Sequence, residues 1–131
     1  MIRHIVSWTL TAEDPSEKLA VAREIKERLE GLAAIIPCVA RAHVGIDLGE
    51  TAGNWDVVLD SDFASREDLD AYQVHPAHTE VSAWIGSVLK INGGGVAMTT
   101  FFGSMAEMLA AVKRRSSEPT GSTKSCPRRN T

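Results

Sequence analysis

The sequence lacks the features that mark several large classes of protein. No run of apolar residues approaches the ~20 that a membrane-spanning helix requires. Its two cysteines, Cys38 and Cys126, do not have the spacing of a metal site, and no signal-peptide pattern follows Met1. At 131 residues the chain is long enough to fold as one domain without disulfides. We therefore expect a cytoplasmic protein with reduced cysteines and no membrane partner.

Basic charge is scarce over most of the chain. Residues 1–106 hold eight Lys and Arg against fifteen Asp and Glu, whereas residues 107–131 hold six against two. Nucleic-acid binding depends mainly on basic side chains that neutralise phosphates. The acidic charge of the larger part therefore argues against a nucleic-acid partner.

Apolar periodicity predicts an alternating arrangement of strands and helices. Helical spacing predicts helices at residues 15–36 and 66–89, with N-caps at Asp14 and Ser65 and an interruption at Pro76. Alternation of apolar and polar residues predicts strands at residues 2–9, 39–48, 55–63 and 96–102. The order β-α-β-β-α-β predicts a ferredoxin-like α+β protomer, in which a four-stranded antiparallel sheet has its helices on one face.

The other face of this sheet needs a cover. The predicted strands carry apolar side chains on both sides, and an exposed patch of that size is unfavourable for a monomer. We expect two copies to pack sheet to sheet as a homodimer. The barrel domain is taken as residues 1–103, followed by a short helix at 104–115 and a disordered basic tail at 116–131.

Proton-handling groups are concentrated in the short segment from Tyr72 to His78. This segment holds the only tyrosine and two of the four histidines. A histidine can take and give a proton near neutrality, and a phenol can donate a hydrogen bond to a developing oxyanion. His4 lies on the apolar face of the first predicted strand. We therefore take Tyr72, His78 and His4 as the candidate catalytic residues.

A structural interpretation of the same residues stays open. His75 precedes Pro76 and is well placed to cap the helix segment that follows. Tyr72 can pack its ring while its hydroxyl bonds a backbone group, and His4 can be a hydrogen-bonded core residue. Because no two of His4, His75 and His78 have the i, i+4 spacing of a helical metal-binding pair, no metal is predicted.

Three segments together resemble the stress-responsive dimeric α/β-barrel family, over about residues 1–102. They are Met1-Ile2-Arg3-His4-Ile5-Val6, the strand at 55–63, and Ala71-Tyr72-Gln73-Val74-His75-Pro76-Ala77-His78. The resemblance implies a cavity between the sheet and the helices. The family includes cofactor-free polyketide cyclases of the olivetolic acid cyclase type, which use the tyrosine and the last histidine of this motif for an aldol condensation. Their pattern also has a histidine early in the third strand, where this chain has Trp55-Asp56-Val57-Val58.

The leading hypothesis is a dimeric barrel protein with an internal cavity that acts as a cofactor-independent, aldol-type cyclase or lyase on a hydrophobic, polyketide-like molecule. His78 is the expected base, Tyr72 the oxyanion donor, and His4 a third site residue. Residues expected to contact the substrate are Trp8, Val57, His75, Val81 and Trp84. One alternative is a non-enzymatic stress-response or assembly protein, in which these residues only hold the second helix to the sheet. A monooxygenase of the related dimeric-barrel type is a further alternative that rests on fold analogy.

Overall fold

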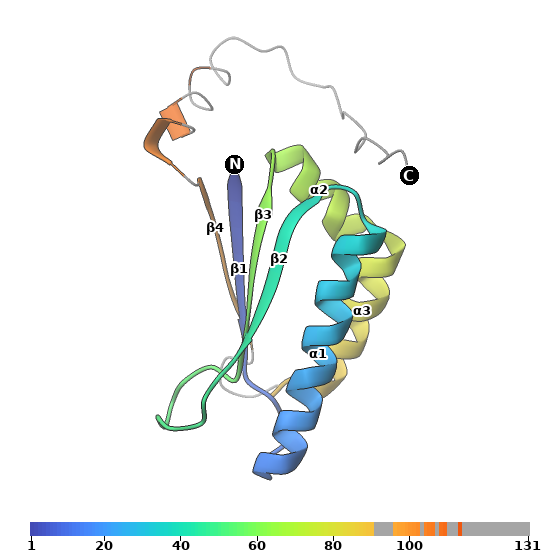
Figure 1. The fold of residues 1–131 in the computed structure, drawn as a ribbon, viewed down its shortest axis with the longest axis vertical. Coiled ribbons are helices and arrows are strands. Elements are labelled where there is room, and N and C mark those ends of the chain that lie inside the picture. The colour runs from blue at the N-terminus through green and yellow to red at the C-terminus, as the bar shows by residue number, and fades with distance from the viewer. Residues whose placement is uncertain (91–95, 103, 107, 110–112, 114–131) are drawn as a thin grey trace.

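The protein folds into one sheet with helices against one of its faces (Figure 1). The computed structural model describes residues 1–90, 96–102, 104–106, 108–109 and 113. In chain order, the elements within these residues are β1 (Ile2–Trp8), α1 (Pro15–Ile35), β2 (Val39–Ile46), β3 (Val57–Phe63), α2 (Arg66–Val74), α3 (Pro76–Val88) and β4 (Val96–Phe102). The ferredoxin-like α+β fold expected from the sequence is confirmed.

The sheet has the strand order β2-β3-β1-β4, and all three pairings are antiparallel. Its register places the central strand β1 between β3 and β4. His4 lies opposite Ser61 on one side and Thr100 on the other. Trp8, which follows His4 by four residues on β1, lies opposite Val57 on β3 and Val96 on β4. Because alternate side chains share a face, His4 and Trp8 both point toward the helices.

The helices begin at the caps that the sequence indicates. Asp14 accepts a hydrogen bond from the Glu17 backbone N–H at 3.1 Å, and Ser65 accepts one from the Asp68 backbone N–H at 3.1 Å. The second predicted helix is divided in two at its proline. His75 ends α2 and also caps α3, where its Nδ1 accepts a hydrogen bond from the Ala77 backbone N–H at 3.1 Å. The capping role considered for His75 is thus present in the structure.

The third strand starts later than its sequence pattern indicates. It begins at Val57, and Trp55 lies in the preceding loop with 38% of its surface exposed. The Asp56 backbone N–H bonds the Trp8 carbonyl at 2.8 Å, while the Asp56 carbonyl accepts a bond from the Asp47 N–H at 2.9 Å. These bonds hold residue 56 at the junction before β3, so the prediction of a strand from residue 55 is wrong by two residues.

The sheet face opposite the helices carries a cluster of charges. Asp62 accepts hydrogen bonds from Arg3 at 3.1 Å and Arg41 at 2.8 Å, and Arg41 also lies 2.8 Å from Asp60. Burial raises the pKa of Asp62, but the bonds from Arg41 and Arg3 outweigh it and leave the pKa below its ordinary value. The expectation of apolar side chains on both faces is therefore wrong at these four charged residues, whereas Ile5, which pairs with Asp60 and lies on the same face, is apolar.

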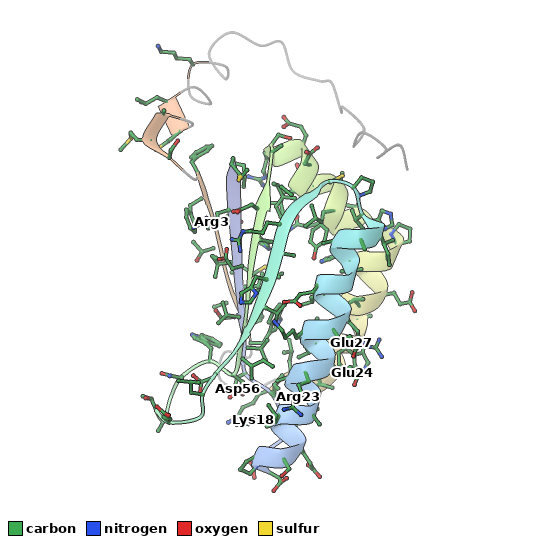
Figure 2. All side chains as sticks on the ribbon, in the orientation of Figure 1. Arg3, Lys18, Arg23, Glu24, Glu27 and Asp56 are labelled. Atoms are coloured by element: carbon green, nitrogen blue, oxygen red, sulfur yellow. The ribbon has the colours of Figure 1, made fainter. Side chains whose placement is uncertain are left out.

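Asp56 ties the end of β1 to the loop before β3 and to α1. Its Oδ2 accepts a hydrogen bond from the buried Leu10 N–H at 2.8 Å, and its Oδ1 lies 3.4 Å from the Lys18 ammonium (Figure 2). Asp56→Ala should lower the free energy of unfolding by about 1 to 3 kcal/mol, because it leaves a buried donor unpaired. Asp56→Asn keeps a carbonyl acceptor and should cost clearly less. Urea unfolding of both variants is the measurement, and equal losses would contradict this account.

None of the described helices has the length and apolar character needed to cross a membrane. The chain is helical at Met105, Ala106, Met108 and Leu109. The tail at 116–131 lies outside the described residues, so the domain boundaries at residues 103 and 115 stay predictions.

Cys38 is buried and disulfide-bonded, so the expectation of a reduced thiol is wrong at this position. The chain's other cysteine lies outside the described residues.

Candidate functional site

A cavity of about 240 Å³ lies between α3 and the β1–β4 half of the sheet. It is not enclosed, because α1, α2 and α3 leave the helix-facing side of β4 uncovered: Val96 and Met98 line the cavity and are 44% and 64% exposed. The expectation of an enclosed internal cavity is therefore corrected to an open one for this protomer. The residues that line it are His4, Val6, Trp8, Leu29, Leu59, Tyr72, Gln73, His78, Ser82, Ile85, Gly86, Leu89, Val96 and Met98.

All three candidate catalytic residues line this cavity. The rings of Tyr72 and His78 lie 4.5 Å apart between centroids, inclined at 55°. They come from different helices, because the chain changes direction at Pro76 between α2 and α3. His4 contributes from β1. The positive charge of a protonated His78 lowers the pKa of His4, after burial as the larger cause, so the two imidazoles interact electrostatically.

His78 is held in the orientation that a general base requires. The Gln73 carbonyl oxygen is an acceptor only and lies 3.0 Å from His78 Nδ1, so Nδ1 carries the proton in the neutral ring. Nε2 is then unprotonated and able to accept a proton. Burial lowers the pKa of His78, the bond to Gln73 opposes this shift, and the charge of His75 adds to it. The neutral form therefore persists to lower pH than in an exposed histidine.

Tyr72 is buried, with 4% of its surface exposed, and its ring packs on Phe63 at 5.1 Å between centroids. Burial raises the pKa of its phenol to about 12, so it keeps its proton throughout the neutral range. Among the described residues, the Tyr72 hydroxyl has no hydrogen-bond partner, and its oxygen is not fully buried. The hydroxyl is therefore a protonated donor available to a molecule in the cavity, rather than bonded to the backbone.

His4 is 5% exposed and is hydrogen-bonded as a core histidine must be. Its Nδ1 lies 2.8 Å from the Thr100 hydroxyl oxygen on β4. Ser61 on β3 bonds the His4 backbone carbonyl at 3.0 Å. Burial, then the charges of His78 and Arg66, lower the pKa of His4. His4 is thus a neutral ring, fixed at one nitrogen by Thr100, in the wall of the cavity.

The cavity has a polar end and an apolar end. His4, Tyr72 and His78 form the polar end. Along β1 the following inward residues are Val6 and Trp8, and their partners on β4 are Met98 and Val96. Polar groups that can act on a ligand are therefore collected at one end of a mainly apolar space, which is typical of small-molecule sites.

Of the five residues expected to contact substrate, the structure brings only Trp8 to this cavity. Val57 is completely buried in the core, and His75 is occupied as a cap. Val81 lines a separate groove of about 330 Å³ between α1 and α3. Trp84 is half-buried beneath Arg28, whose guanidinium carbon lies 4.2 Å from the ring centroid.

Several site residues were missed by sequence reasoning. Ser82 and Gly86 follow His78 at steps of four on α3, and this spacing was a signal that places them on the same helix face. Met98 and Thr100 had no such signal, because only the β1–β4 register places them beside Val6 and His4. No group of three potential metal-binding side chains occurs within the part of the chain that the structure describes.

The profile of the family described as the stress responsive A/B barrel domain matches residues 2–92. The structure is similar to a dimeric ferredoxin-like protein of unknown function from Bacteroides fragilis, with 27% identity, a TM-score of 0.66, and coverage of 76% of this chain and 93% of that chain. A dimeric ferredoxin-like protein of unknown function from Thermobifida fusca gives 28% identity, a TM-score of 0.62, and coverage of 76% and 88%.

The hydroxynitrile lyase of Passiflora edulis has 18% identity, a TM-score of 0.64, and coverage of 79% of this chain and 94% of the lyase. This similarity shows a shared fold. A search of curated proteins found no match.

Proposed function

We propose that this protein, which belongs to the stress-responsive A/B barrel family, performs cofactor-independent general-base chemistry on a small hydrophobic carbonyl compound. The reaction class is an aldol-type cyclisation or its reverse, a carbon–carbon lyase reaction. The observation that carries this proposal is the pairing of His78, with Nε2 free to accept a proton, and Tyr72, with an unpartnered hydroxyl, in the wall of one cavity.

In the proposed reaction, His78 Nε2 removes a proton from the carbon beside a carbonyl group, and the electron pair moves to the carbonyl oxygen. The Tyr72 O–H donates a hydrogen bond to the resulting enolate, which stabilises the charge where it develops. The enolate carbon then attacks a second carbonyl of the same molecule and forms a carbon–carbon bond. Protonated His78 returns its proton to the new alkoxide. The lyase reaction follows these steps in reverse.

The apolar end of the cavity supports a ligand with a hydrophobic part. Trp8, Leu89 and Val96 surround that end and offer no charged group. A polyketide-like molecule has reactive carbonyls at one end and can carry an alkyl or aryl group at the other. The resemblance to polyketide cyclases belongs to this proposal, since the tyrosine and the last histidine of that motif correspond to Tyr72 and His78.

The non-enzymatic alternative predicts different surroundings for the side chains of Tyr72 and His78. If Tyr72 and His78 only held α2 and α3 to the sheet, neither polar side chain would need to reach a cavity, whereas both line one. Among the described residues, the Tyr72 hydroxyl also bonds no other group of the protein. This difference favours the enzymatic proposal.

We also propose that the working form is a homodimer. Structures similar to this chain are described as dimeric. On β4, Met98, Phe101 and Phe102 are 64%, 42% and 37% exposed, although they come from both faces of the strand. A second copy that covers this edge would shield the open side of the cavity from water.

The proposal is tested by enolisation, the first half of any aldol reaction. The measurement is exchange of the α-protons of 2-heptanone with deuterium, followed by proton NMR, with heat-denatured protein as the control. Because His78 must be neutral and its pKa is lowered, kcat/KM should be level above pH 6.5 and fall at lower pH, with a midpoint below the ordinary value of 6.5. A rate equal to that of the control, or a midpoint at or above 6.5, would contradict the proposal.

A further inference from the structure

We propose that Gly86 sets the length of the apolar group that the cavity accepts. This inference rests on the proposed function for its choice of ligand, a carbonyl compound with an apolar tail. It makes Gly86 a specificity-determining residue rather than a catalytic one.

The backbone of Gly86 does not require a glycine. It lies within α3, and the glycines of the described chain with positive φ are Gly49 and Gly53. A glycine inside a helix is less favourable than an alanine, because it loses more conformational freedom on folding. Close packing does not explain it either, since a Cβ added to Gly86 would meet no atom within 4 Å. Gly86 is exposed, it lines the cavity, and a side chain added there would enter open space.

Gly86 lies toward the apolar end of that cavity. It follows His78 by eight residues, or about 12 Å along the axis of an α-helix. The end of α3 is fixed beside the end of β1 by bonds of 2.9 Å from the Lys90 N–H to the Thr9 carbonyl and from the Thr11 N–H to the Val88 carbonyl. On β1, the four residues from His4 to Trp8 span about 13 Å in the same direction. Gly86 is therefore beside the Trp8 end, away from the proton-handling groups.

A side chain at position 86 should shorten the accepted tail without touching the polar end. The test uses a homologous series of straight-chain methyl ketones, from 2-pentanone to 2-undecanone, with dissociation constants measured by calorimetry. For the wild type, affinity should rise about fourfold for each added methylene until the tail fills the cavity. In Gly86→Val the rise should stop two to three carbons earlier, so that the longest ketones bind at least tenfold more weakly while 2-pentanone is unaffected.

Gly31 supplies a matched control. It is also a helical glycine whose added Cβ meets nothing within 4 Å, but it lies in α1 and lines the other groove. Gly31→Val should leave the length limit unchanged. Both Gly86→Ala and Gly31→Ala should raise the melting temperature by a few degrees, which checks that each helix accepts a side chain.

The outcomes separate this inference from the proposed function. A shorter length limit in Gly86→Val together with no α-proton exchange by the wild type would support the role of Gly86 and overturn the catalytic proposal. An equal change across all ketones, no change at all, the same shortening in Gly31→Val, or no binding of any ketone to the wild type would overturn the role of Gly86.

Discussion

Replacing His78 with glutamine is expected to lower the rate of α-proton exchange by about 10² to 10⁴, the usual contribution of a positioned general base. Glutamine cannot accept a proton near neutrality, yet its amide N–H can still donate toward the Gln73 carbonyl that holds His78 at 3.0 Å. The substitution therefore removes the base while keeping a side chain that can donate a hydrogen bond. The loss should appear in kcat, with little change in KM for the ketone.

His43 provides the control for this substitution. It is an exposed histidine on β2, with 63% of its side chain accessible, and it does not line the cavity. His43→Gln should leave the exchange rate unchanged. If both glutamine variants retained the wild-type rate, or lost it to the same extent, His78 would not be the base.

The stability of the same variants supplies a second readout. A lowered pKa means that the folded protein binds a proton at His78 less readily than the unfolded chain does. Wild-type stability should therefore be level above about pH 6.5 and decrease as the pH falls from 6.5 toward the lower folded-state pKa. His78→Gln should remove part of that decrease, and His4, whose pKa is also lowered, should account for the rest.

Replacing Tyr72 with phenylalanine is expected to lower kcat for exchange by about 10² to 10³, as the loss of one oxyanion donor typically does. The ring and its packing on Phe63 and His78 are retained, at centroid distances of 5.1 and 4.5 Å. Because the hydroxyl has no partner among the described residues, its removal should leave the free energy of unfolding at neutral pH nearly unchanged. A reduced rate with unchanged stability is the result that a purely structural tyrosine would not give.

The alkaline behaviour of this variant tests the burial of the phenol separately. The folded-state pKa of Tyr72 is raised to about 12 from an ordinary value of 10.0. Its contribution to stability is therefore present below pH 10 and is lost as the pH rises from 10 toward 12. Tyr72→Phe should be less sensitive to pH in that window. A large loss of stability at neutral pH with full activity would instead favour the assembly hypothesis.

Local features of the sequence determined the elements and the identity of the candidate site. Asp14 and Ser65 mark helix starts by side-chain chemistry that acts within three residues, and a proline at position 76 cannot continue a helix hydrogen-bond pattern. The Tyr72 to His78 motif gave the proton-handling residues, and alternation in β1 placed His4 on the same side of the sheet as the helices. These are short-range effects that a single sequence displays directly.

Tertiary structure decided which of these residues meet and what surrounds them. The β1–β4 register brings Thr100 to His4, and no local pattern encodes a pairing across ninety-six positions. Apolar character alone could not separate Val57, which is buried in the core, from Trp8, which lines the cavity. The site thus combines residues that are identifiable one by one with an arrangement fixed only by long-range strand pairing, because side-chain periodicity specifies a face of an element but not its neighbour.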